Sequence, residues 1–261
     1  MLALLLIPVV VAIVLVSVVG STWIQGSLSS PRTTFRPAPP LFTVPMLDVA
    51  PGSAVPAGVG PVPASVAGPN DPRIRWIAAV SANSDIPRRA LTAYVGAAAV
   101  TAARNPGCHL SWTTLAGVAR AESMHGRYHG DSIGPDGVQR TAITGPALDG
   151  SPGRKTVPDT DHGTLDGDPV WDHALGPLQF LPSTWAKWGV RASGDGRPAD
   201  PQDIDDAALT AARYLCASGG DLGGAAGWWA AMFVYNNSSS YGREVFSDAD
   251  AYARVSHRIP V

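Results

Sequence analysis

The chain has 261 residues, 45% of them hydrophobic, so it is long enough for one sizeable folded domain and too apolar to be disordered throughout. Its 19 basic and 21 acidic side chains nearly cancel, and no Lys/Arg cluster is present. This balance excludes the strongly basic surface that is typical of nucleic-acid-binding proteins. Glutamate is scarce, because every acidic residue except Glu122 and Glu244 is an aspartate.

Residues 1–24 form an apolar segment without a charged side chain. At about 1.5 Å per helical residue, this length crosses the roughly 30 Å hydrocarbon core of a bilayer. The segment lacks the basic start of an ordinary secretory signal, although Val18 and Gly20 suit a cleavage site before Ser21. A retained membrane anchor and a cleaved signal peptide both fit this pattern, and both predict that the rest of the chain is exported.

Residues 25–70 contain ten prolines among Ser, Ala and Gly, with only three charged side chains. Such a composition buries too little apolar surface to offset the conformational entropy that is lost on ordering. The sequence therefore predicts a disordered linker between the apolar segment and a domain that begins at residue 71.

The remainder, residues 71–261, has the periodicity of a mainly α domain, because no stretch alternates with period two. Ala-rich bodies, Ser and Asp caps and Asn-Pro-Gly stops place the helices. The predicted helices span 88–105, 112–123, 183–188, 203–218, 225–235 and 241–255. Between them, residues 125–175 are punctuated by Gly, Pro and Asp. A long loop of this kind inside a domain is usually functional, so we expect it to wall a site.

Glu122 is a candidate catalytic acid on the 112–123 helix. It lies three or four positions beyond the apolar residues Val118 and Ala119, which directs its carboxyl toward the core. A partly desolvated carboxyl has the raised pKa that general acid catalysis near neutral pH requires. The alternative is a glutamate in the last helical turn that pairs with Arg120 or Arg127.

Two further motifs carry side chains suited to sugar. Residues 176–180 form a Gly-Pro turn before a short helix, which would present Gln179 and Phe180 at the rim of a pocket. Tyr235 and Asn236 stand where an apolar helix ends. Amides read acetamido and hydroxyl groups, and aromatic rings pack on sugar faces. Taken singly, these motifs are also ordinary turn and helix-end patterns.

Three segments resemble, in order and spacing, the three motifs of lytic murein transglycosylases. They are residues 121–123, residues 176–180 with 182–185, and residues 235–236. Specifically, they look like the motifs of the membrane-bound type B group, and segments 145–150 and 159–168 look like its actinobacterial branch. The resemblance extends from residue 71 to the C-terminus. It implies a lysozyme-like catalytic domain, of the goose-type or SLT kind, whose partners are the glycan strands of peptidoglycan.

The resemblance also implies a mechanism and a set of roles. In this family one glutamate, here Glu122, protonates the bond between N-acetylmuramic acid and N-acetylglucosamine, then withdraws the proton of the C6 hydroxyl to form a 1,6-anhydro sugar. Ser123 and Tyr235 would position this carboxyl. Sugar contacts would come from Gln179, Phe180 and Asn236. The chemistry requires no cofactor.

Two alternatives stay open at this stage. A muramidase would hydrolyse the same bond with a second carboxylate, such as an aspartate of the 131–172 loop. A non-catalytic wall-binding module would keep the aromatic residues and tolerate the loss of Glu122.

The only cysteines, Cys108 and Cys216, predict a disulfide, because an even pair in an exported domain meets an oxidising compartment. Two buried free thiols are the alternative. For metals, Ser193, Asp195 and Asp203 lie where relatives carry a calcium loop. Arg191 stands at the expected first ligand, so we interpret this stretch as a solvated turn in which Asp203 caps the next helix. Residues 159–168 are a second oxygen-rich tract.

Overall fold

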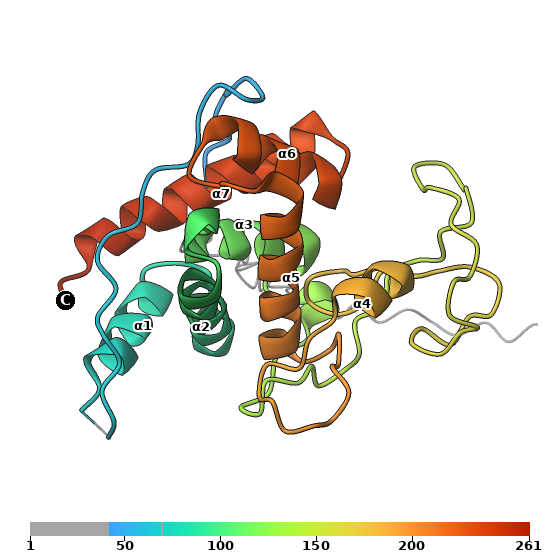
Figure 1. Cartoon of the computed structure of the whole chain (residues 1–261), viewed down its shortest axis with the longest axis horizontal. Coiled ribbons are helices and arrows are strands. Elements are labelled where there is room, and N and C mark those ends of the chain that lie inside the picture. Colours follow the sequence, from blue (N-terminus) through green and yellow to red (C-terminus); the bar gives the residue numbers. More distant parts are fainter. Residues whose placement is uncertain (1–41, 69) are drawn as a thin grey trace, which may run out of the picture. The chain divides into compact units, whose positions relative to one another are not determined.

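The computed structural model describes residues 42–68 and 70–261, and Figure 1 shows their arrangement. The described part contains the helices α1 (Pro72–Ala82), α2 (Arg88–Arg104), α3 (Trp112–Ser123), α4 (Pro182–Trp188), α5 (Ile204–Gly219), α6 (Ala225–Tyr235) and α7 (Ser239–Arg258). It contains no β-strand, only isolated bridges. The predicted mainly α fold is confirmed. The apolar segment 1–24 and residues 25–41 lie outside the described residues, and no described helix is both long and apolar enough to cross a membrane.

Four of the described helices, α1, α3, α5 and α7, begin where a capping side chain supplies an acceptor. The Ser111 side chain accepts a hydrogen bond from the amide of Thr113 at the start of α3, and that of Asp203 accepts from the amide of Asp205 at the start of α5. Both caps satisfy amides that have no partner inside the helix. The sequence did not define α1, whose capping residue Asp71 stands at the predicted domain boundary.

Helix α3 is the centre of the core, packed against α7 and α2. Its residues Leu115, Val118 and Ala119 are completely buried. At Gly117 the two backbones nearly touch, because a Cβ atom there would lie 2.7 Å from the carbonyl oxygen of Val245 on α7. Any larger residue would push α7 away from α3. Around this pair, α5 packs between α2 and α6.

The prediction of a disordered linker is wrong for the described part of that segment, residues 42–68. These residues pack along α7 (blue in Figure 1). The ring of Phe42 stacks on Tyr252 at 5.4 Å. Buried polar side chains of α7 accept backbone amides of the segment, in the pairs Leu47 to Ser247, Ala57 to Asp250 and Gly60 to Ser256, at 2.8 to 3.1 Å. These bonds satisfy polar groups that would otherwise be buried without partners. The folded unit therefore begins well before residue 71.

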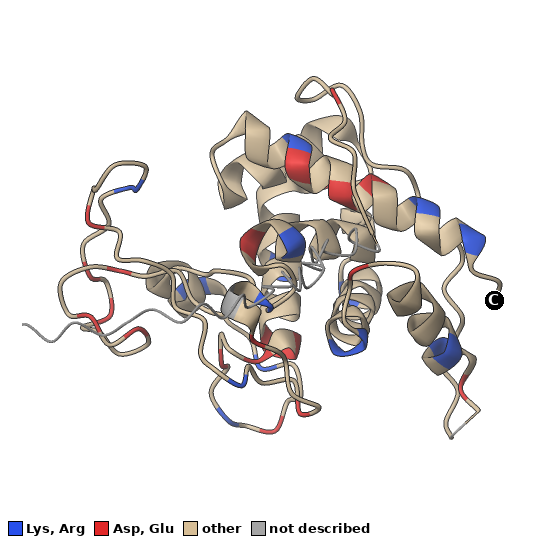
Figure 2. Cartoon of the chain, turned by 180° about the vertical axis from the view of Figure 1, so that it is seen from behind, with Lys and Arg blue, Asp and Glu red and all other residues tan. Residues whose placement is uncertain are grey.

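The Gly-, Pro- and Asp-rich loop leaves the helical body and runs out beyond α4 (green to yellow in Figure 1). Its arms are joined by isolated antiparallel bridges, Asp149 with Thr156 and Pro158 with Trp171. Charged residues of both signs are interspersed along the loop and the helices (Figure 2).

The predicted disulfide between Cys108 and Cys216 is present. It joins the short turn before α3 to the last part of α5, with Cα atoms 5.5 Å apart. The amide of Leu222 also donates to the carbonyl of Cys108 at 2.8 Å. The start of α3 is thereby tied to α5, across a sequence separation of 108 residues.

We expect removal of this bridge to destabilise the fold, because it constrains a long loop in the unfolded chain. A Cys108→Ala/Cys216→Ala variant should lose about 2 to 5 kcal/mol of unfolding free energy in denaturant titrations. Thiol titration of unreduced, denatured protein exported by its host should find no reactive thiol. Two reactive thiols per chain would contradict the pairing.

Candidate active site

Glu122 is the penultimate residue of α3, directly before a sharp reversal of the chain. Met124, His125 and Gly126 all have positive φ, of 52°, 62° and 78°. The buried hydroxyl of Ser123 accepts from the amide of Gly126 at 2.7 Å and donates to the carbonyl of Pro177 at 2.6 Å. Ser123 therefore joins the end of α3 to the 176–180 turn. Because its side chain is buried, Ser123 can position Glu122 only by fixing this reversal of the chain.

The Glu122 carboxyl is partly buried, and Tyr241 on α7 donates a hydrogen bond to its Oε1 at 2.8 Å. Burial raises the pKa of Glu122 to about 7, against the lowering effect of the Tyr241 hydrogen bond and with a smaller raising effect from the Glu244 carboxylate. A carboxyl with this pKa is both a proton donor and a proton acceptor near neutral pH.

Tyr241, and not Tyr235, holds the Glu122 carboxyl. The hydroxyl of Tyr235 donates to the carbonyl of Leu178 at 2.8 Å, and the Tyr235 ring stacks on that of Tyr241 at 6.5 Å with an interplanar angle of 5°. Tyr235 thus supports the Tyr241 ring and makes its own hydrogen bond to the 176–180 turn rather than to Glu122. One signal for Tyr241 is present in the sequence, namely a phenol in the first turn of the helix that follows Tyr235.

The 176–180 turn is held tightly. Gly176 has φ 72°, and a Cβ atom there would lie 1.8 Å from the carbonyl oxygen of Pro201, so only glycine fits. Gln179 also has positive φ, 48°, and its side-chain amide donates to the carbonyl of Gly176 at 2.9 Å. Its side chain is only partly buried, and it stays a candidate for sugar contact.

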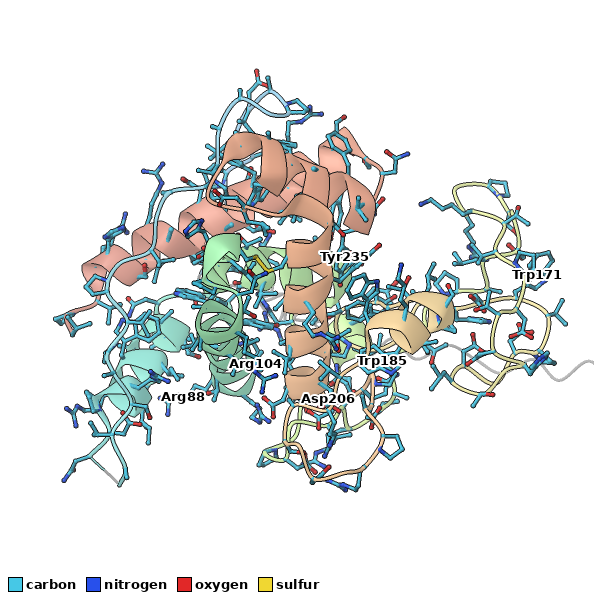
Figure 3. All side chains as sticks on the ribbon, in the orientation of Figure 1. Arg88, Arg104, Trp171, Trp185, Asp206 and Tyr235 are labelled. Carbon is cyan, nitrogen blue, oxygen red and sulfur yellow. A yellow bond between two sulfur atoms is a disulfide. The ribbon has the colours of Figure 1, made fainter. Side chains whose placement is uncertain are left out.

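The expected place of Phe180 at the pocket rim is wrong. Its side chain is 3% exposed and packs edge-on against Trp185 and Tyr235 at 5.3 and 5.9 Å (both labelled in Figure 3). Phe180 supports the turn from the core instead. Asn236 forms the C-cap of α6 and is partly exposed, which leaves its expected role open.

The sequence alternative of an ion pair between Glu122 and a neighbouring arginine is also contradicted. Arg120 bridges Asp85 and Asp248 at 2.9 and 2.7 Å, and Arg127 donates to backbone carbonyls. Within the described residues, no ion pair involves Glu122. Its burial is therefore not compensated by a cation, which is why its pKa rises.

A pocket of about 1040 Å³ lies along the end of α3, beside the reversal that follows Glu122. Glu122 is not among the residues that line it. Its lining comes from four segments, namely Phe42–Val44, Ser81 with Ser84–Pro87, Arg120 with Met124 and Arg127, and Ser132–Ile133.

The expected solvated turn around Asp195 proves to be organised by an arginine. The Arg191 guanidinium contacts Asp195, Asp203 and Asp206 at 2.8 to 3.0 Å, while Ser193 is exposed. Two of the three calcium candidates, Asp195 and Asp203, are therefore already neutralised by a positive side chain, which disfavours a metal ion there.

No protein-family model matches the sequence, and no curated protein matches it significantly. Among solved structures, the chain is similar to the Escherichia coli lytic transglycosylase Slt35 in complex with bulgecin A, with a TM-score of 0.39 and 15% sequence identity. The similarity covers 69% of this chain and 78% of that chain. A likeness of this size supports no inference about activity.

The hydrogen bond from Tyr241 predicts a directional change in the Glu122 pKa. Because the bond favours the ionised carboxylate, Tyr241→Phe should raise this pKa by about one unit. Tyr235→Phe removes the same hydroxyl from a neighbouring ring but spares the bond, so it should leave the pKa nearly unchanged.

Carbon NMR can measure the Glu122 pKa directly, because the chain has only two glutamates. Protein labelled with ¹³C at the glutamate carboxyl gives two resonances, which Glu244→Gln assigns. An equal pKa shift in both tyrosine variants would contradict the role given to Tyr241.

Proposed function

We propose that the chain is a lytic transglycosylase of peptidoglycan, with a lysozyme-like catalytic domain, that cleaves the β-1,4 bond between N-acetylmuramic acid and N-acetylglucosamine. One observation carries the proposal. The Glu122 carboxyl, whose pKa is about 7, is held by Tyr241 directly beside the 176–180 turn. The three motifs that resemble this family in sequence thus meet around one titratable group.

The chemistry needs a carboxyl that exchanges its proton readily in both directions. Protonated Glu122 gives its proton to the glycosidic oxygen as the bond to C1 breaks. The resulting carboxylate then accepts the proton of the C6 hydroxyl while the C6 oxygen bonds to C1, so the acid is regenerated and no water is consumed. A group with a pKa of about 7 is matched to both steps at neutral pH.

The other residues have supporting roles in this proposal. Tyr241 orients the carboxyl and, as a donor to its ionised form, stabilises the carboxylate between the two steps. Gln179 and Asn236 are the proposed amide contacts to sugar. Ser123, Phe180 and Tyr235 fix the turn and the aromatic stack from inside the protein.

Export to the cell wall is part of the same proposal. It is supported by the apolar start of the sequence and by the Cys108–Cys216 disulfide, which persists in oxidising compartments. Whether residues 1–24 remain as an anchor decides between a membrane-bound and a secreted enzyme. Mass spectrometry of the mature N-terminus distinguishes the two.

Glu244 favours a second candidate function, a muramidase that hydrolyses the same bond. Glu244 lies one turn after Tyr241 on α7, and its negative charge raises the pKa of Glu122. Hydrolases that retain or invert the anomeric centre commonly use a second carboxylate as nucleophile or base. Glu244 is exposed and is the only other glutamate of the chain, so it is the residue to test as the second carboxylate.

Glu122→Gln should abolish turnover, because the amide has nearly the same shape and cannot give a proton. We expect a rate loss of at least about 10² to 10⁴-fold in the digestion of purified peptidoglycan, followed by mass spectrometry of the products. The wild-type products should end in 1,6-anhydro-N-acetylmuramic acid, one water lighter than hydrolysis products. A variant that folds normally and keeps about a tenth of the activity would contradict the catalytic assignment.

Glu244→Gln separates the two functions. In a transglycosylase this variant should stay active within several-fold, and the loss of activity at alkaline pH should begin at a lower pH. The sign follows from charge, since removing a nearby negative group lowers the pKa of Glu122 and so depletes its acid form earlier. Near-complete loss of activity, together with products that carry the extra water, would support the muramidase instead.

A further inference from the structure

Three carboxylates converge in the loop beyond α4, far along the chain from Glu122. Asp159, Asp161 and Asp172 each offer an oxygen atom, and these atoms all lie within 4.8 Å of one another. Figure 3 labels Trp171, the neighbour of Asp172, on this loop.

Backbone amides fix the orientation of two of these side chains. The Oδ1 atom of Asp159 accepts from the amides of Asp161 and Gly163, both at 3.1 Å, and the Oδ2 atom of Asp161 accepts from the amide of Leu165 at 2.9 Å. The third carboxylate, Asp172, accepts from the amide and the hydroxyl of Thr160, both at 2.8 Å. The loop thus holds the three groups together despite their like charge.

In the part of the chain that the structure describes, one buried oxygen atom of the cluster has no partner, and no Lys or Arg neutralises its charge. The Oδ1 atom of Asp161 is buried and has no hydrogen-bond partner within the described residues. Asp172 is completely buried, and no Lys or Arg of the described chain pairs with any of the three carboxylates. Their one basic neighbour, the fully exposed His162, lies 3.9 Å from Asp159. Buried carboxylates are costly unless a cation or a metal ion neutralises them.

The same chain shows how it neutralises such a cluster elsewhere. Asp195, Asp203 and Asp206 also converge, and there the guanidinium of Arg191 contacts all three. In the cluster of Asp159, Asp161 and Asp172, no side chain takes that place among the described residues. The difference points to a cation supplied from solution.

We propose that Asp159, Asp161 and Asp172 form a calcium-binding site. Calcium takes oxygen ligands at about 2.3 to 2.6 Å, so two ligand atoms of one ion lie at most about 5.2 Å apart. Oxygen atoms that all lie within 4.8 Å of one another can therefore share one ion. Magnesium demands about 2.0 to 2.1 Å in near-ideal octahedral geometry, which a set of irregular loop carboxylates suits less well. Backbone carbonyls or water complete the coordination.

Bound calcium would join the two arms of the loop. Asp159 and Asp161 lie on one arm, while Asp172 lies on the arm that leads through Leu175 into the 176–180 turn. The ion would therefore order the segment that precedes this turn. The inference concerns binding and loop order alone, and it does not rest on the proposed catalytic function.

The test uses the full chain, freed of metal with a chelator and kept at constant ionic strength. Isothermal titration with CaCl₂ should find one site, with a Kd on the order of 10⁻⁵ to 10⁻³ M. Lysine occurs only at Lys155 in the loop and at Lys187 in α4. Endoproteinase Lys-C should cut at the exposed Lys155, and about 10 mM CaCl₂ should slow this cut at least about tenfold by suppressing local opening.

Asp161→Asn should abolish both the binding and the protection, and Asp172→Asn should do the same if Asp161→Asn perturbs the fold. The control is Asp149→Asn, which removes an exposed carboxylate of the same loop outside the cluster and should retain the calcium effect. Absence of calcium binding to the wild-type chain, or unchanged binding in both cluster variants, would overturn the proposal. Equal protection by MgCl₂ would overturn the assignment to calcium.

Discussion

The close contact of α3 and α7 at Gly117 is the constraint on which the candidate site depends. Because this residue has no side chain, the backbone of α3 approaches the carbonyl of Val245 more closely than any Cβ atom would permit. This approach places the first turn of α7 over the last turn of α3, so that the Tyr241 hydroxyl meets the Glu122 carboxyl. The reversal after Glu122, fastened by Ser123, then places the 176–180 turn on the same side.

Local signals in the sequence were sufficient for most of the helices and for the disulfide. The Ser111 and Asp203 caps and the breaks at proline and glycine are short-range effects that need no knowledge of the fold. The inward direction of Glu122 followed from helical spacing for the same reason. The cysteine pair needed only its count and an inferred compartment.

The errors concern partners that are distant in sequence. Composition alone predicted that residues 42–68 are part of a linker. Their ordering depends on hydrogen bonds to α7, about 200 residues away, which composition does not reveal. Phe180 was expected at a rim, since its motif does not reveal that Tyr235, at the end of α6, packs against its ring. Tyr241 was missed because two adjacent phenols compete for one carboxyl, and only the packing of α7 on α3 decides between them.

Burial of the Glu122 carboxyl links the stability of the fold to the protonation that catalysis would require. Its pKa of about 7 in the fold exceeds the ordinary value of 4.5, so the folded chain holds this proton more tightly than the unfolded chain does. That advantage is complete below about pH 4.5 and is lost as pH rises through 7. It would amount to about 3 kcal/mol for a fully buried group, and partial exposure reduces it. This contribution to stability is thus lost under alkaline conditions, where the carboxyl has also lost the proton that makes it an acid.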